Sequence, residues 1–361
     1  MAMIAGCTGP NGTGPTGAPV SSTPAGHLTS DLYISDDSGY VLKVSPAGVL
    51  SVVAGNGKRF QRPTPGAAAS SPIMPYGLAV DPAGNLYVAD NLLDVVKISA
   101  NGDLSMVAGG DPTPGPDSPQ PYIGPVPGPA MRSPMHPIDV ALDTAGNVHI
   151  ADDTGYVLKV TPDGMMSIAA GLGKATLPPE PGPATTSPMS PAGIDLDRSG
   201  NVYLADNKGY VLKITPGGVL SIIASVGSCG GSTPGMRRAC LASAPIGIAV
   251  DDAGNVYVAE GPYIDKIAPD GTISTVAGNG KLGQAVPGPA VDSPLMPLAV
   301  AVDKAGDVCV ITHSAVYLVT PDGMLSLVAG QPDRQDTVPQ QPTPGPATDS
   351  PVTPVGVALG P

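Results

Sequence analysis

The sequence predicts an all-β fold, a six-bladed β-propeller whose blades are antiparallel sheets of four strands. Three observations predict it: a unit of 52 to 62 residues recurs along the chain, each copy divides into four short apolar runs, and the two ends of the chain carry complementary parts of one further copy. Four-stranded antiparallel sheets repeated around an axis form a β-propeller. The 361 residues, 42% of them hydrophobic and without helical periodicity, are sufficient for one large all-β domain.

The repeated unit is clearest at Pro245–Gly278, which reads PIGIAVDDAGNVYVAEGPYIDKIAPDGTISTVAG. Its apolar runs are separated by turn sequences in which Gly and Asn supply positive φ and Pro presets φ at the start of the turn. One aspartate recurs at the same place in five copies: Asp81, Asp143, Asp197, Asp251 and Asp303. The sequence therefore predicts five complete blades.

The sixth blade is predicted from the two ends of the chain together, and it closes the ring. Asp31–Gly55 holds the second, third and fourth strands of a unit without the first, and Ser350–Pro361 holds a first strand without the rest. We expect the C-terminal strand to pair with the N-terminal strands, so that the ring has no open sheet edge at this point. Residues 27–361 then form a single propeller domain, preceded by a flexible Gly/Pro/Ser/Thr-rich tether over residues 1–26.

Long Pro-rich segments connect the fourth strand of one unit with the first strand of the next. Several share the phrase PGPAxxSP, as in GLGKATLPPEPGPATTSP. Because each segment makes the same step between blades, we expect all of them to lie over one face of the disc, where surface connections are suited to binding.

The recurring string PxGIAVDxAGNVYVAD, followed by a KVTPDGxLSTVAGNG-like stretch and a PGPAxxS connection, resembles the NHL-repeat propellers, in particular the bacterial extracytoplasmic and teneurin-type versions. The resemblance covers about Asp31–Pro361 and implies the propeller fold. Typical bacterial units carry a polar TGNNRIRK stretch where this chain has DTGYVLK or NKGYVLK, so the arginine-bearing turn is missing. The family includes RNA binders, receptor sensor domains and a lyase, so the resemblance does not select one function.

The composition argues against nucleic-acid partners. The chain has a formal net charge of -13 and a pI near 4.4, whereas a phosphate backbone requires a basic face. Aromatic residues make up 3% of the chain and Trp is absent, so platforms for stacking bases or sugars are scarce. Most tyrosines recur at fixed strand positions, for example Tyr33, Tyr87, Tyr203 and Tyr257, and are expected to pack between blades.

The cysteines indicate an oxidising compartment. Cys229 and Cys240 flank the loop CGGSTPGMRRAC within one connection, and we predict that they form a disulfide; the alternative is two free surface thiols. Cys309 replaces a repeated tyrosine in a second strand and is predicted to be a buried structural thiol.

Lipid attachment is a hypothesis for the N-terminal segment. Ile4–Cys7, IAGC, resembles the lipobox of a bacterial lipoprotein, with Cys7 as the lipidation candidate. Only six residues precede Cys7 in this sequence, so the charged and apolar parts of a signal peptide are not seen, and an accidental match is the alternative. No apolar run reaches the roughly 18 residues that span a membrane, so membrane attachment would be through lipid.

Catalytic motifs are not found: the sequence has no HExxH, CxxC, GxSxG or phosphate-loop pattern. His149 replaces a repeated tyrosine and His313 occupies a repeated turn position, so both are expected to be structural. The acids that recur after the second strands suit capping of turn amides; they are Asp36, Asp90, Asp152, Asp206 and Glu260.

Two carboxylates on first strands are the most informative departures from the repeat. First strands alternate small and branched residues, and we expect the small ones to face the channel and the branched ones to face the blade core. Asp139 replaces a small Gly and Asp195 a small Ala in adjacent units, and His136 precedes the strand of Asp139. These three residues are candidates for a divalent cation site at the channel mouth. The alternative is that the carboxylates are solvated or bonded to backbone amides.

Two functions from different classes follow. The first is a non-enzymatic extracytoplasmic binding or scaffold propeller, monomeric and without a cofactor, whose Pro-rich connections contact a protein or another cell-envelope component. The second is a metal-dependent lyase or lactonase that uses His136, Asp139 and Asp195 at the channel mouth. An enzyme of this kind needs several metal ligands to converge on the axis, and the chain offers only these three, so the sequence favours binding.

Overall fold

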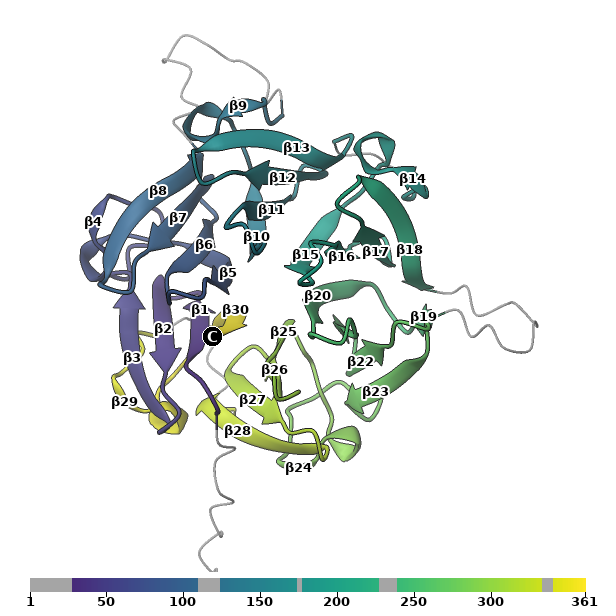
Figure 1. Ribbon diagram of the computed structural model, residues 1–361. Helices are drawn as coiled ribbons and strands as arrows, with labels where there is room; N and C mark the ends of the chain where they lie inside the picture. Colours follow the sequence, from purple (N-terminus) through teal and green to yellow (C-terminus); the bar gives the residue numbers. More distant parts are fainter. Residues whose placement is uncertain (1–27, 110–123, 174–176, 227–238, 333–339) are drawn as a thin grey trace, which may run out of the picture.

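Six antiparallel sheets surround a central axis, as Figure 1 shows. The computed structural model describes residues 28–109, 124–173, 177–226, 239–332 and 340–361. In each sheet the first strand lies nearest the axis and the fourth lies near the rim. The predicted all-β, six-bladed propeller is confirmed. Within the described ranges no helix is long and apolar enough to cross a bilayer.

The four strands of each blade follow one another outward, and the blades are numbered in chain order. Blade 1 contains β30 (Pro354–Leu359), β1 (Leu32–Asp36), β2 (Tyr40–Val44) and β3 (Val49–Ala54). Blade 2 contains β5 (Pro75–Val80), β6 (Leu86–Asp90), β7 (Asp94–Ile98) and β8 (Asp103–Gly109). Blade 3 contains β10 (Pro137–Leu142), β11 (Val148–Asp152), β12 (Tyr156–Val160) and β13 (Met165–Gly171).

The second half of the ring repeats this arrangement. Blade 4 contains β15 (Pro191–Leu196), β16 (Val202–Asp206), β17 (Tyr210–Ile214) and β18 (Val219–Val226). Blade 5 contains β20 (Pro245–Val250), β21 (Val256–Glu260), β22 (Tyr263–Ile267) and β23 (Ile273–Ala277). Blade 6 contains β25 (Ala299–Val302), β26 (Val308–Ile311), β27 (Ala315–Val319) and β28 (Met324–Gly330).

Strand β30 closes the ring, as predicted. It pairs antiparallel with β1, so that Leu32 lies opposite Leu359 and Ile34 lies opposite Val357. Leu32 and Ile34 are fully buried. Val357 and Leu359 of β30 pack against the apolar cluster that contains them. The first blade therefore depends on apolar contacts between the two ends of the chain.

The connections run along the rim before they turn inward. Each PGPA-type segment forms a two-residue strand that pairs with the outermost strand of the blade it leads into: β4 (Gly66–Ala67), β9 (Gly128–Pro129), β14 (Gly182–Pro183), β24 (Gly288–Pro289) and β29 (Gly345–Pro346). A short 3₁₀ turn follows each of them: Ala68–Ser70, Ala130–Arg132, Ala184–Thr186, Ala290–Asp292 and Ala347–Asp349. The described parts of the connections thus do not lie only over one face, because they first cover the open edges of the outer strands.

These turns also join neighbouring blades. The buried Ala68 donates its N–H to the Gly102 carbonyl of blade 2 (2.8 Å) and accepts the Gly55 N–H from the end of blade 1 (3.0 Å). Blade 5 is different: its described sheet has only four strands, and the preceding segment β19 (Ala239–Leu241) pairs in parallel with β18 of blade 4.

The repeated acids are structural, as predicted. Asp90 is fully buried; its Oδ2 accepts the Met74 N–H and its Oδ1 accepts the Leu92 N–H, both at 2.8 Å. The same two kinds of contact recur at Asp36, Asp152 and Asp206, and Glu260 accepts the Ser243 N–H. Each acid therefore caps a turn amide, bonds to the incoming connection, or does both.

The other structural predictions divide into confirmed and untested ones. Cys309 is a fully buried free thiol, and Tyr203 and Tyr257 are buried between blades. His149 is buried with Nε2 3.2 Å from Asp143 Oδ2. Cys7 and the tether over residues 1–26, together with Cys229 and the side chain of Cys240, lie outside the described residues, so the lipidation and the disulfide stay predictions.

Removal of the closing strand tests the role of the chain ends. Deleting Pro354–Pro361 should lower the stability by on the order of 5 kcal/mol, since it exposes the apolar side of β1 and removes Val357 and Leu359 from the core. Calorimetry should show a Tm lowered by roughly 10 °C or more. Deleting Pro361 alone is the matched control and should have little effect; an unchanged Tm for the longer deletion would contradict the closure.

Candidate functional site at the central channel

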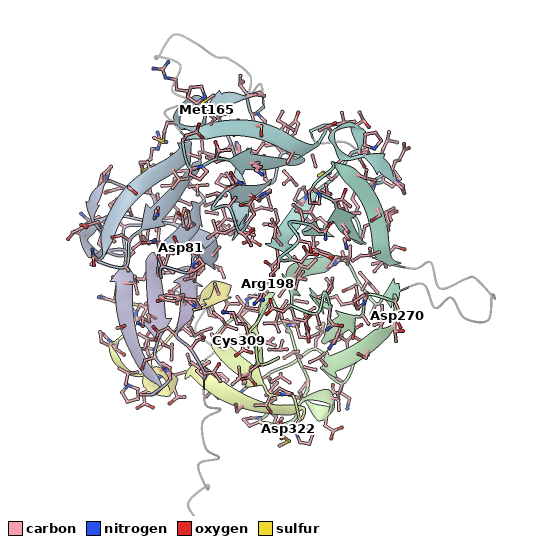
Figure 2. All side chains as sticks on the ribbon, in the orientation of Figure 1. Asp81, Met165, Arg198, Asp270, Cys309 and Asp322 are labelled. Carbon is pink, nitrogen blue, oxygen red and sulfur yellow. The ribbon has the colours of Figure 1, made fainter. Side chains whose placement is uncertain are left out.

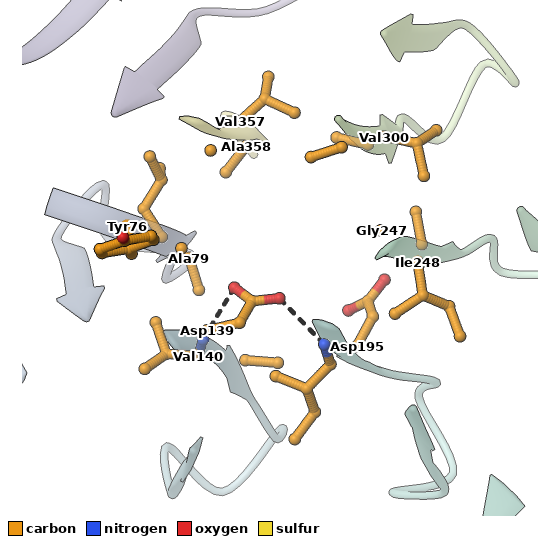
Figure 3. A pocket seen from close by; sticks show the side chains of 18 of the residues that line it. Tyr76, Ala79, Asp139, Val140, Asp195, Gly247, Ile248, Val300, Val357 and Ala358 are labelled. Atoms are coloured by element: carbon orange, nitrogen blue, oxygen red, sulfur yellow. Dashed lines mark hydrogen bonds between the residues drawn. The ribbon is translucent and has the colours of Figure 1, made fainter. Parts of the chain in front are cut away.

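A cavity of about 470 Å³ runs along the axis, lined by the first strands of all six blades. Figure 3 shows it from close by, with Asp139 and Asp195 pointing into it from neighbouring blades. Cavities of this size hold small organic ligands. The channel is therefore the candidate functional site.

One mouth of the channel is apolar. At the start of each first strand, or just before it in blade 6, the residue after a proline lines the cavity, and together these residues form an apolar collar: Tyr76, Ile138, Ala192, Ile246, Leu298 and Val355. The polar Asn207, whose Nδ2 donates to the Pro191 carbonyl, also lines the cavity. Tyr76 and Ile246 are 36% and 37% exposed. The collar lies on the face where the connections enter the first strands, called the connection face below. The collar was not predicted, although its signal, an apolar residue after a recurring proline, is present in the repeat.

The small residues of the first strands line the cavity, but each also lies against the next blade, so the prediction that they face the channel is correct only in part. A Cβ added to Gly77 would lie 2.6 Å from Asp139 Cα, and one added to Gly247 would lie 2.7 Å from Ala299 Cα. The reason is that each sheet faces its two neighbouring blades, and only the edge of the first strand faces the channel. Glycine is required where adjacent first strands approach most closely.

Asp139 and Asp195 join neighbouring blades at the axis. Asp139 Oδ1 accepts the N–H of Val140 and Oδ2 that of Ile194 in blade 4, both at 2.9 Å (Figure 3). Asp195 Oδ1 accepts the N–H of Leu196 and Oδ2 that of Val250 in blade 5, both at 2.8 Å. In the described part of the chain no further strand pairs with the inner edge of a first strand, so these carboxylates satisfy amides that would otherwise depend on water.

The same two carboxyls set the electrostatics of the cavity. Burial within the channel walls raises the pKa of Asp139 to about 7 and that of Asp195 to about 6, although the backbone hydrogen bonds act in the opposite direction. The charge of Asp195 raises the pKa of Asp139 further. None of the described residues that line the cavity is a Lys, Arg or His. Above about pH 7 the channel is therefore negatively charged and not neutralised by its own lining.

His136 does not join the two aspartates. Its side chain does not line the cavity, its Nδ1 lies 3.9 Å from Asp153 Oδ1, and its backbone N–H donates to Asp152 (2.7 Å). Across the described ranges, no three His, Cys, Asp or Glu side chains are grouped to hold a metal ion. Of the three predicted metal ligands, only Asp139 and Asp195 thus line the channel together. Both accept hydrogen bonds from backbone amides, which was the alternative to metal binding.

Comparison with known proteins supports the fold. No family model matches the chain, and no curated protein sequence matches it. Among solved structures it is similar to a protein of unknown function from Bacteroides thetaiotaomicron, at 13% identity over 90% of this chain and 83% of that one, with a TM-score of 0.58. Auxiliary nutrient binding proteins from B. thetaiotaomicron and Bacteroides ovatus match at 12% and 11% identity, each over 91% of this chain and over 71% and 72% of theirs, with TM-scores of 0.56 and 0.55. At these identities the similarity shows a shared propeller fold.

The raised pKa values of the two carboxyls predict a pH dependence of stability. A pKa raised in the folded state contributes stability that is present below the unfolded value near 3.8 and lost as the pH rises through 6 to 7. The double variant Asp139→Gly, Asp195→Ala restores the residue types of other blades and should lose less Tm between pH 5 and pH 8. We expect a difference of about 3 °C, from on the order of 1 kcal/mol after allowance for channel water. Parallel curves of Tm against pH for the two proteins would contradict this assignment.

Proposed function

We propose that this chain is a non-enzymatic binding propeller that holds a small ligand in its central channel, entered from the connection face. The observation that carries the proposal is the cavity itself: about 470 Å³, open at an apolar collar, with two carboxylates inside it. Ligand sites commonly combine apolar side chains with convergent polar groups. Here the collar supplies the apolar side chains, and Asp139, Asp195 and the first-strand backbone supply the polar groups.

The cavity also indicates the chemistry of the ligand. Each oxygen of Asp139 and Asp195 accepts one backbone N–H and has a second lone pair for a donor in the channel. The described lining residues include no cation. A positively charged ligand should therefore bind with a more favourable free energy than a neutral or anionic one. The proposed ligand is an organic ammonium compound whose apolar part contacts the collar.

The wider assignment is an extracytoplasmic propeller of NHL type. The recurring unit supports the family, and the predicted Cys229–Cys240 disulfide and the lipobox-like Ile4–Cys7 support the location. Two proteins of similar fold carry the name auxiliary nutrient binding protein, which agrees with a binding role for this architecture. Peptide mapping with and without a reducing agent tests the disulfide, and two free thiols in the secreted protein would contradict it.

Binding of matched six-carbon probes tests the function. At pH 8, where Asp139 and Asp195 are ionised, calorimetric titration should show hexylammonium binding at least about tenfold more tightly than hexanol, because a charge-assisted hydrogen bond contributes about 1.5 to 3 kcal/mol. Hexanoate should bind most weakly. The Asp139→Gly, Asp195→Ala variant should lose the preference for the ammonium compound.

A control variant separates the site from the overall charge. Asp270 and Asp322 are exposed in turns of blades 5 and 6, away from the axis in Figure 2. Asp270→Asn, Asp322→Asn removes the same number of charges as the channel variant and should keep the preference. Equal binding of all three probes would refute the ammonium ligand, and no binding of any probe would refute the channel as the binding site.

The alternative function, a metal-dependent lyase or lactonase, would require a metal held by protein ligands at the same mouth. The described residues do not group three such ligands, and Asp139 and Asp195 are already bonded to amides. We therefore expect elemental analysis of protein purified without chelator to find far less than one equivalent of divalent metal. Stoichiometric metal that is lost in the Asp139→Gly, Asp195→Ala variant would instead favour the enzyme.

A further inference from the structure

Blade 5 contains a pair of buried carboxyl groups, Glu260 and Asp265. Blade 2 also buries two, Asp90 and Asp94, but there Arg62 pairs with Asp94. Glu260 ends β21 at the position of the repeated capping aspartate. Asp265 lies in β22 at the position that holds a buried leucine in blades 1, 3 and 4: Leu42, Leu158 and Leu212. Glu260 is 0% and Asp265 7% exposed. A leucine position has thus been replaced by an ionisable group beside another one.

Each of the two groups has one buried oxygen without a hydrogen-bond donor among the described residues. Glu260 Oε2 accepts the Ser243 N–H at 2.9 Å. Glu260 Oε1 and Asp265 Oδ1 are buried and have no hydrogen-bond donor among the described residues. Asp265 pairs with Val258, two residues before Glu260 on the same face of the sheet, so the carboxyls are neighbours. Two ionised carboxylates at neighbouring buried positions would repel each other, whereas one shared proton lets one group donate to the other.

The surroundings offer no described cation to take the place of that proton. This side of blade 5 packs on blade 4 through Val258 and Ile267. The titratable and charged groups facing it are Tyr263 opposite Glu260, and Tyr203 and Lys213 of blade 4. Lys213 lies over the ring of Tyr203, whose hydroxyl donates to Asp197 at the other end of the strand, and Lys208 at the nearer end donates to the Leu177 carbonyl.

We propose that Glu260 and Asp265 share one proton, and that its loss as the pH rises above neutral loosens the segment that leads from Ser243 into β20. That segment reaches the collar residue Ile246 after three positions, and the following residues Gly247 and Ile248 line the cavity. The shared proton therefore links pH to the shape of the channel mouth. This inference stands whether or not the channel binds an ammonium ligand.

The direction of the effect follows from the burial of the pair. Burial, and the hydrogen bond and charge of Asp265, raise the pKa of Glu260 to about 7, although backbone donors act in the opposite direction. The stabilisation is fully present below the ordinary glutamate value of 4.5 and is lost as the pH rises through about 7. Loss of the shared proton leaves two adjacent buried negative charges, which is unfavourable unless the segment opens and admits water.

Hydrogen exchange of the full chain between pH 6 and pH 8.5 tests the proposal. After correction for the chemical exchange rate, opening of peptides covering 242–267 should increase about tenfold for each pH unit above 7. Asp265→Leu restores the residue of the sister blades and should largely abolish this increase. Strands β11 and β12 of blade 3, where Asp152 accompanies Leu158, are the internal control and should show no comparable change.

A measurement on the unmodified protein covers the case in which a variant does not fold. Carboxyl carbon NMR of the glutamate side chains should show one group titrating near pH 7, and Glu260→Gln should remove that signal. Titration of every glutamate near its ordinary value would overturn the shared proton. Equal pH-dependent opening in the Asp265→Leu variant would overturn the role of the pair in holding the segment.

Discussion

Six first strands converge on one axis, and the space left between them constrains the rest of the molecule. Where adjacent strands approach most closely, only glycine fits, as the position of Gly77 against Asp139 shows. Each inner edge has amides without a strand to pair with, and in blades 4 and 5 these amides are bonded to the carboxylates of Asp139 and Asp195. The cavity is what remains after this packing, so its shape and its charge derive from the same few positions.

Much of the fold could be predicted from the sequence because the repeat fixes it several times over. The blade number, the strand order and the closure by β30 all follow from matching copies. The orientation of first-strand side chains was predicted only in part: the small residues line the cavity, but alternation along a strand does not show that they also lie against the next blade. Asp139 and Asp195 were recognised as departures from the repeat, but their bonds to the next blade depend on distances between blades that no pattern encodes.

Repetition separates scaffold from site in this chain. The acids present in nearly every blade, such as Asp81 and Asp90, accept backbone N–H groups in turns and contribute to the fold of each blade alike. Asp139 and Asp265 each occur once at their repeat position. Asp139 places a carboxylate in the channel, and Asp265 places a carboxyl group where other blades have an apolar side chain. Comparison of equivalent positions between blades therefore shows which residue the fold alone requires at each position.

The register of the closing pair has a mechanical consequence. Leu32 at the start of β1 lies opposite Leu359 at the end of β30, so residues before β1 and residues after β30 leave the sheet at the same end. A load applied between these two points would peel the strands apart one hydrogen bond at a time, instead of shearing all of their bonds together. Tension between the two ends of the ring is thus resisted by only one hydrogen bond of this pair at a time.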